Sequence, residues 1–381
     1  MRFVQRALIA CFLCFSIVVN GQNDPLDHMV GQMIMVGYND YYNASQQKEI
    51  LRLIEEGKVG GIILFEKNLK KNGTKAELAK MIAELQSKAE IPLFMGIDEE
   101  GGRVNRLKPK YGFPETRSAQ YLGELDNVDS TRYYANAVAE NLSKYGFNVN
   151  YAPNVDVNIN PDNPVIGKAE RSYSAEPATI ARHAEIVIEE HDKQNVITVL
   201  KHFPGHGSSA ADSHLGIADV SNSWQFNEIY PYMELIRQNK VKAVMSAHIV
   251  NRVLDERMLP GTLSDKVIKG ILRDALKFDG VVFSDDMHMG AIAKEYGLEE
   301  AIVLAANADL DVLMFSNNIY EDEKVSGEEL HQIIVKNVKN GQISMETIAK
   351  SYQRIISLKA EMGMLEQDYR ESLQNRLNEL Y

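Results

Sequence analysis

The chain has 381 residues and only two cysteines, Cys11 and Cys14, which both lie near its amino terminus. No cysteine follows them in the remainder of the chain. This excludes a disulfide framework, a thiol nucleophile and a cysteine-ligated metal site from the part of the chain that folds.

Long hydrophobic runs are also scarce. One run covers residues 7–19, follows Arg2 and Arg6, and is too short to span a bilayer. A basic start followed by a short apolar run is typical of a secretory signal peptide, which we assign to residues 1–21. The sequence therefore predicts export, to the periplasm or outside the cell. Lipid attachment at Cys11 is disfavoured because few apolar residues precede it, and no later segment is long enough to cross a membrane.

Positive charge is in the minority, with 41 Lys and Arg against 53 Asp and Glu and a formal net charge of −12. An acidic protein repels polyphosphate, which argues against a nucleic-acid partner. Hydrophobic residues make up 45% of the chain and charged residues 25%, so disordered and fibrous classes are excluded. The length fits two ordinary domains or one large domain.

Short apolar runs rich in β-branched residues alternate with amphipathic helical segments. Many of these runs lack a strict alternation of polar and apolar residues, as expected for strands buried on both faces of a parallel sheet. The runs are Met33–Tyr38, Val59–Phe65, Leu93–Asp98, Val149–Val157, Ile197–His202, Ala243–His248, Gly280–Asp285 and Asp309–Phe315. Eight β–α units predict an α/β fold, a (β/α)8 barrel of the TIM type. An open doubly wound sheet is the alternative, but no G-x-G-x-x-G follows a strand.

Helical patterns occupy the segments between these runs. They cover Thr74–Ala89, Ser130–Tyr145, Thr179–Gln194, Asn227–Gln238 and Asp265–Leu276. Thr74 and Ser264 are the expected N-caps of the first and the last. Two further amphipathic helices follow the eighth run, and there is no linker or second apolar core. The sequence thus predicts one barrel domain over residues 22–365 and a polar tail over residues 366–381.

Most of the predicted strands end in polar side chains. In a barrel, the carboxyl ends of the strands meet at the face where active sites are built. These polar residues are Asp98-Glu99-Glu100, Asn154, Asp156, Lys201-His202, His248, Ser284-Asp285-Asp286 and Ser316-Asn317-Asn318. Their recurrence predicts a functional face at this end of the barrel.

Three of the nine histidines lie in one segment, which begins KHFPGHG at Lys201 and ends DSH at His214. Its proline and glycines end regular structure, and the small residues 208–211 predict a mobile loop over the barrel mouth. A turn can bring the carboxylate of Asp212 to His214 and fix the imidazole tautomer. His214 is therefore a candidate general acid/base, and a surface loop with incidental polar residues is the alternative.

A pair of adjacent acids, Asp285 and Asp286, ends the strand GVVF. A carboxylate held at a strand end is suited to act as a nucleophile. Successive side chains of an extended chain point in opposite directions, so one acid should face the pocket and the other should be structural. The residues alone do not decide between the two.

A third cluster begins at Asp98 and continues through two glycines to Arg106, which can fold back toward Asp98. Such a pair can bind sugar hydroxyls or form an ion pair that stabilises a loop. Arg171 is a further candidate, on the loop after the strand that contains Asn154 and Asp156.

A metal site is the other interpretation of the histidine segment, with His202, His206, His214 and Asp212 as ligands. Proline and glycine separate the first two histidines, so they share no helical face, and neither H-E-x-x-H nor H-x-H is present. The sequence therefore predicts no metal.

Taken together, KHFPGHG with DSH, IDEEGGRV upstream and GVVFSDDM downstream closely resemble glycoside hydrolase family 3. The resemblance covers roughly residues 33–360 and is strongest to the single-domain β-N-acetylhexosaminidase branch, often called NagZ-like. It implies a cofactor-free (β/α)8 barrel. It also implies removal of terminal β-linked N-acetylglucosamine with retention, through a glycosyl-enzyme.

The resemblance also implies roles for individual residues. Asp285 matches the nucleophile, and His214 assisted by Asp212 matches an unusual acid/base. The positions that match sugar-binding residues are Asp98, Arg106, Arg171, Lys201 and His202. A histidine in place of the second carboxylate departs from the usual retaining pair, but it adds no negative charge beside the nucleophile and it titrates near neutral pH.

Two features differ from the family pattern. The loop 163–169 is longer than in compact relatives and can alter the side that binds the leaving group. The export signal differs from cytosolic members that recycle cell-wall fragments. A phosphorylase acting on the same saccharides and a non-catalytic sugar-binding barrel remain as alternatives.

Overall fold

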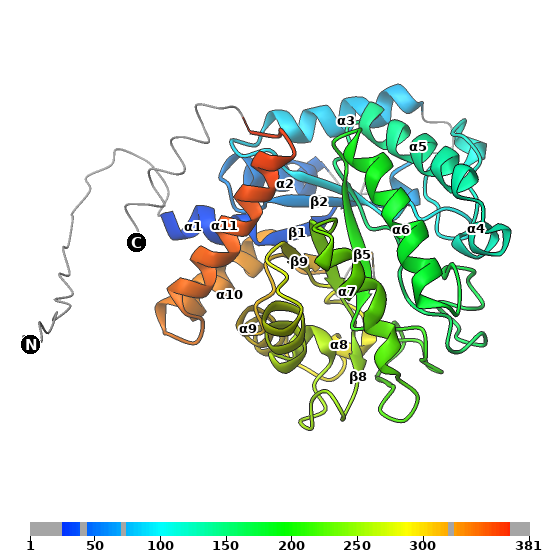
Figure 1. Cartoon of the computed structure of the whole chain (residues 1–381). Coiled ribbons are helices and arrows are strands. Elements are labelled where there is room, and N and C mark those ends of the chain that lie inside the picture. The colour runs from blue at the N-terminus through cyan, green and yellow to red at the C-terminus, as the bar shows by residue number, and fades with distance from the viewer. Residues whose placement is uncertain (1–24, 39–43, 70–73, 319–323, 366–381) are drawn as a thin grey trace, which may run out of the picture.

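Eight parallel strands form the centre of the molecule in the computed structural model (Figure 1). They are β1 (Ile34–Gly37), β2 (Gly61–Leu64), β3 (Phe94–Ile97), β4 (Val149–Asn150), β5 (Ile197–Phe203), β7 (Ala243–Ser246), β9 (Val281–Phe283) and β10 (Leu313–Phe315). The hydrogen-bonded order is β10-β1-β2-β3-β4-β5-β7-β9, and a parallel bridge between Phe283 and Val312 joins the two ends. The eight predicted strands are all present, and the predicted barrel is confirmed.

The structure describes residues 25–38, 44–69, 74–318 and 324–365. The predicted signal peptide and polar tail, residues 1–21 and 366–381, lie outside these ranges. Over the described ranges, no helix combines the length and the apolar character that crossing a membrane requires.

Helices surround the barrel (Figure 1). They are α1 (Pro25–Gln32), α2 (Ala44–Glu55), α3 (Lys75–Ser87), α4 (Ala119–Leu125), α5 (Val128–Lys144), α6 (Pro177–Asp192), α7 (Tyr230–Arg237), η5 (Lys266–Ala275), α8 (Gly290–Ala293), α9 (Leu298–Asn307), α10 (Gly327–Lys339) and α11 (Met345–Glu361). Thr74 is the N-cap of α3, as predicted, because its hydroxyl accepts from the backbone N of Glu77.

The start of η5 differs slightly from the prediction. The N-cap is Asp265, although the hydroxyl of Ser264 also accepts a hydrogen bond from the backbone N of Val267 at 3.2 Å. The element is a π-helix, with bonds such as Leu276 N to Ile271 O. The expected helix is thus present, with a wider winding than the sequence pattern indicated.

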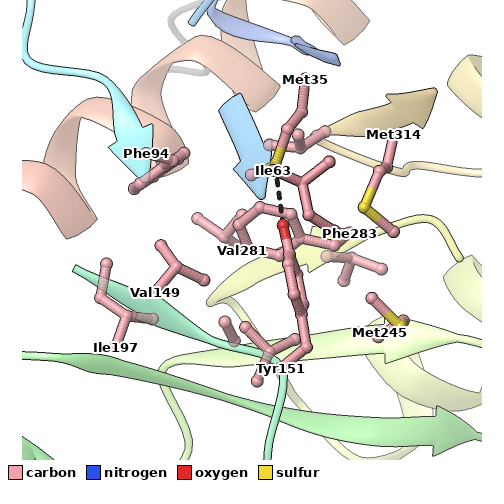
Figure 2. Packing of buried hydrophobic residues seen from close by; sticks show 14 of the residues in the cluster. Met35, Ile63, Phe94, Val149, Tyr151, Ile197, Met245, Val281, Phe283 and Met314 are labelled. Carbon is pink, nitrogen blue, oxygen red and sulfur yellow. Dashed lines mark hydrogen bonds between the residues drawn. The ribbon is translucent and has the colours of Figure 1, made fainter. Parts of the chain in front are cut away.

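The interior of the barrel is filled by side chains from the strands (Figure 2). Tyr151 is fully buried there, with its hydroxyl directed at the sulfur of Met35 and its ring edge-on to Phe283. Met245 and Met314 project into the same core. Because side chains fill the interior, the barrel is a packed core, and its active site is expected at the mouth formed by the carboxyl ends of the strands.

The opposite end of the barrel is closed by a buried lysine. Lys359 of α11 is 0% exposed, and its ammonium donates to Gln32 Oε1 at 2.7 Å and to Gly60 O at 3.3 Å. It also lies 4.4 Å from the centre of the Phe94 ring. No carboxylate is among these partners, and burial lowers the pKa of Lys359 to about 7.

This lysine predicts a pH dependence of stability. Between pH 7 and the ordinary lysine pKa of about 10.4, the unfolded chain holds a proton that the folded chain has released, so stability rises with pH. From about pH 6 to about pH 9, wild type should gain about 2–3 kcal/mol of unfolding free energy relative to Lys359→Met. Urea unfolding of both proteins at several pH values measures this. A constant difference would mean that the ammonium stays charged when buried.

Candidate active site

Charged side chains from several strand ends meet at the mouth of the barrel. Lys201, at the end of β5, has its ammonium 2.7 Å from Asp98 Oδ1 and 2.6 Å from Glu100 Oε1. Its side chain is 1% exposed, so it is held by these two carboxylates beneath the surface of the mouth. Strand ends about 100 residues apart in the chain are thereby joined by one cation.

Two arginines complete this network. Arg106 folds back as the sequence indicated, with Nη2 3.3 Å from Asp98 Oδ2. Arg171 donates to both oxygens of Glu100, at 2.9 and 2.7 Å, and lies 3.3 Å from His202 Nε2. Burial alone would raise the pKa of Asp98, but the charges of Lys201 and Arg106 hold it well below its usual range. Asp98 is therefore held in its ionised form beside these cations.

A second buried carboxylate organises the histidine segment. Asp156 accepts from the ring Nδ1 of His202 at 2.7 Å and from the backbone N of His202 and of His206 at 3.1 and 2.8 Å. Burial opposes ionisation of Asp156, yet the charge of a protonated His202 and its hydrogen bond hold the pKa of Asp156 below the usual range. Asp156 thus fixes both the ring of His202 and the turn that follows it.

The loop 163–169 packs directly against this turn. Asn163 Nδ2 donates to the carbonyl of His206 at 2.7 Å, and its Oδ1 accepts from the backbone N of Val165 at 2.9 Å. The carbonyl of Val165 in turn accepts from Arg171 at 3.0 Å. The loop 163–169 therefore supports Arg171 directly and holds the turn at His206 through Asn163.

The two acids after β9 have different surroundings. Asp286 accepts from the backbone N of Ser316 at 3.0 Å and of His288 at 3.2 Å, and also from the Ser316 hydroxyl. Asp285 has one such bond, from the backbone N of Asp286 at 2.8 Å. Asp286 is thus committed to joining β9 to β10, and Asp285 is the acid that remains available to the mouth.

Histidines surround Asp285. Burial by itself would raise its pKa, but the charges that His248, His202 and His214 carry when protonated outweigh burial and lower it. His248 is buried, with Nδ1 2.7 Å from Thr262 Oγ1 and Nε2 2.9 Å from the carbonyl of Asp286. These imidazoles favour an ionised Asp285.

Asp212 and His214 pair as the sequence predicted. Asp212 Oδ1 lies 2.7 Å from His214 Nδ1 and also accepts from the His214 backbone N at 2.9 Å. The His214 side chain is 59% exposed. With Nδ1 engaged by the carboxylate, Nε2 is the nitrogen left to exchange a proton at the mouth.

Within residues 208–211, where we expect a mobile loop, the first two residues are packed and the last two are exposed. Ser208 and Ser209 are buried, and their backbones bond to Glu228 Oε2 at 3.2 Å and to Asn160 Nδ2 at 2.9 Å. Further along, Ser213 O and His214 O accept from the start of α8. The loop is held at both ends because the barrel supplies polar partners that its small residues do not reveal.

Several residues of this site were not assigned roles from the sequence. Glu100, Asp156 and His248 were visible only as polar strand ends, and Asn163 only as part of a long loop. Glu228 lies in η3 (Phe226–Ile229), and burial raises its pKa to about 7. A single glutamate within a helical pattern gives no indication in the sequence that its side chain is buried beside the site.

Two histidines of the metal interpretation have other partners in the structure. The described residues contain no group of three or more His, Cys, Asp or Glu side chains arranged to hold an ion. His202 and His206 instead engage Asp156 and Ser213.

Comparison with known proteins gives a consistent result. Residues 25–358 match the model of the glycosyl hydrolase family 3 N terminal domain. Beta-hexosaminidase A of Pseudoalteromonas piscicida is 29% identical over 88% of this chain and 61% of its own length. Beta-hexosaminidase LpqI of Mycobacterium tuberculosis is 30% identical over 87% of this chain and 81% of its own.

A solved structure agrees with these relatives. The glycoside hydrolase family 3 beta-N-acetylglucosaminidase from Paenibacillus sp. str. FPU-7 superposes with a TM-score of 0.81 at 35% identity, over 90% of this chain and 63% of that one. This chain thus spans less than two thirds of that protein and of Beta-hexosaminidase A. The match to the family model covers nearly all of the described barrel, and the chain belongs to glycosyl hydrolase family 3.

Proposed function

We propose that this chain is an exported exo-β-N-acetylglucosaminidase that hydrolyses terminal β-linked N-acetylglucosamine with retention of configuration. The observation that carries the proposal is the pairing of Asp212 with His214 at the mouth that also holds Asp285. A sugar-binding module needs neither a nucleophile nor a proton donor. Relatives named as β-hexosaminidases and β-N-acetylglucosaminidases supply the substrate class.

In the proposed reaction, Asp285 attacks the anomeric carbon while Nε2 of His214 gives a proton to the departing oxygen. The neutral imidazole then takes a proton from water, which attacks the glycosyl-enzyme and releases the sugar with its original configuration. Asp212 orients the ring throughout. Two steps on opposite faces account for retention.

The charged network would bind the sugar. Asp98 and Arg106 are its more accessible members, and Arg171 and His202 border them. Lys201 is buried beneath Asp98 and Glu100, so we assign it the task of orienting those carboxylates. Because these partners are already fixed by one another, little ordering is needed when substrate binds.

A substrate panel tests the proposal. The purified protein should cleave 4-nitrophenyl β-N-acetylglucosaminide much faster than the corresponding β-glucoside and β-xyloside, with or without a chelator. Proton NMR of the first product should show the β-anomer. Preference for another sugar would overturn the substrate assignment, and loss of activity in chelator with recovery in zinc would overturn the mechanism.

Phosphorolysis is the alternative that one observation favours. The proton donor is an imidazole, which repels an anionic acceptor less than a carboxylate would. Adding phosphate and looking for a glycosyl phosphate separates the two reactions. We expect the free sugar to be the main product in both conditions.

Export and the domain limits are part of the same proposal. We infer that residues 1–21 are removed and that residues 22–365 form the catalytic domain, followed by a polar tail over 366–381. Intact-mass measurement of the secreted protein would show a chain that begins at Gln22. A retained amino terminus would contradict this.

The position of the loop depends on a glycine in α8. A Cβ at Gly290 would lie 2.8 Å from the carbonyl oxygen of His214 and 2.9 Å from the carbonyl carbon of Leu215. These are backbone atoms, so the loop must shift, and we expect Gly290→Ala to lower kcat/KM about 10- to 100-fold. Gly216→Ala is the matched control, because no atom lies within 4 Å of its Cβ position. Similar kinetics for both variants would show that α8 does not place His214.

A further inference from the structure

His206 is buried and is not part of the reaction proposed above. Its Nε2 lies 3.0 Å from the hydroxyl of Ser213, the residue between Asp212 and His214. Ser213 is itself buried, whereas the His214 side chain is largely exposed. Ser213, the buried residue between Asp212 and His214, thus attaches the acid/base pair to the barrel.

The other end of this connection is firmly held. The backbone N of His206 donates to Asp156 Oδ1 at 2.8 Å, the same oxygen that accepts from the backbone N of His202. The rings of His202 and His206 face each other edge-on, with centroids 6.0 Å apart. The carboxylate of Asp156 therefore fixes both His202 and His206.

Helix α8 also holds Ser213. Its carbonyl accepts from the backbone N of Ala291 in α8. The segment is thereby fixed between the barrel and α8. Burial lowers the pKa of His206 to about 4, so this ring is neutral at neutral pH.

We propose that His206 is a positioning residue for the acid/base, which it places over the departing oxygen through the Ser213 hydroxyl. This rests on the proposed function. A misplacement of about 1 Å costs a reaction roughly 100-fold. Loss of this contact should lower the rate for substrates whose leaving group needs a proton, and it should leave the affinity for the sugar unchanged.

The test compares substrates that need protonation to different degrees. His206→Leu and Ser213→Ala should each lower kcat/KM for the disaccharide N,N′-diacetylchitobiose about 10- to 100-fold. The burst rate with an activated 4-nitrophenyl glycoside and the inhibition constant of free N-acetylglucosamine should change little. The double variant should be no worse than either single variant, because both remove the same contact.

Conservative variants provide the rescue. Gln carries an amide nitrogen close to the place of imidazole Nε2, so His206→Gln should recover most of the lost activity, and so should Ser213→Thr. If His206→Leu fails to fold, Ser213→Ala alone tests the proposal, because it removes a single oxygen atom and should leave the fold intact.

The outcomes separate the two proposals. An inactive wild type overturns both. An active wild type with the expected His214→Ala phenotype, but with normal His206→Leu and Ser213→Ala enzymes, overturns only the positioning role. Equal losses on both substrates, or losses that add in the double variant, would also overturn it, because they indicate general damage.

Discussion

Replacing Asp285 with alanine is expected to lower kcat by about four orders of magnitude or more, even with an activated aryl glycoside. The variant lacks the atom that forms the glycosyl-enzyme, and the nearest acid, Asp286, is bound to Ser316 and His288. The folded state should persist, because Asp285 accepts only one short-range bond, from the backbone of Asp286. Steady-state kinetics with circular dichroism measures both expectations.

Asp286→Ala is the matched control. It leaves the backbone N of Ser316 and of His288 without an acceptor, so it should cost roughly 1–3 kcal/mol of stability. Below its melting temperature it should keep far more activity than Asp285→Ala. An inactive Asp286→Ala beside an active Asp285→Ala would show that the roles of the two acids are reversed.

Azide adds a stereochemical check. In Asp285→Ala, azide can occupy the space of the missing carboxylate and displace the aryl group directly. The product should be the α-glycosyl azide, with inverted configuration. A β-azide would require an intact nucleophile and would exclude Asp285.

Replacing His214 with alanine should have the second largest effect, and its size should depend on the leaving group. A sugar alkoxide needs a proton to depart, whereas a nitrophenolate needs little help. General acid–base catalysis is typically worth about 10²–10⁴-fold, and we expect this loss in kcat/KM for the disaccharide. The aryl substrate should be affected much less in its first step.

The second step of the His214→Ala reaction should be slow for every substrate, because water loses its base. A burst of nitrophenol followed by slow turnover is expected in stopped-flow traces. Azide attacks without a base, so it should restore turnover and give the β-glycosyl azide, the opposite anomer to that from Asp285→Ala. If kcat/KM fell equally for the disaccharide and the aryl glycoside and no burst appeared, His214 would have only a structural role.

Asp212→Ala provides a graded comparison. It removes the partner 2.7 Å from Nδ1 but leaves the imidazole itself. Its losses should follow the same leaving-group pattern as His214→Ala and be smaller.

The sequence by itself determined the architecture. The alternation of apolar runs with amphipathic segments predicted each of the eight strands, because a strand buried on both faces needs a continuous apolar run. Local chemistry was equally readable, as at the Thr74 cap and in the short Asp212-Ser213-His214 turn. These features depend on residues close together in the chain.

Only the tertiary structure decided which side chains act together over long separations. Apart from the family resemblance, the residues left the roles of Asp285 and Asp286 open, and Ser316 of the neighbouring strand end distinguishes them in the structure by binding Asp286. Arg171 meets Glu100 across 71 residues because β3 and β4 pair side by side, so the loops that follow them lie next to each other. Such contacts are set by where strands end in space, and a sequence pattern records only that each strand ends in something polar.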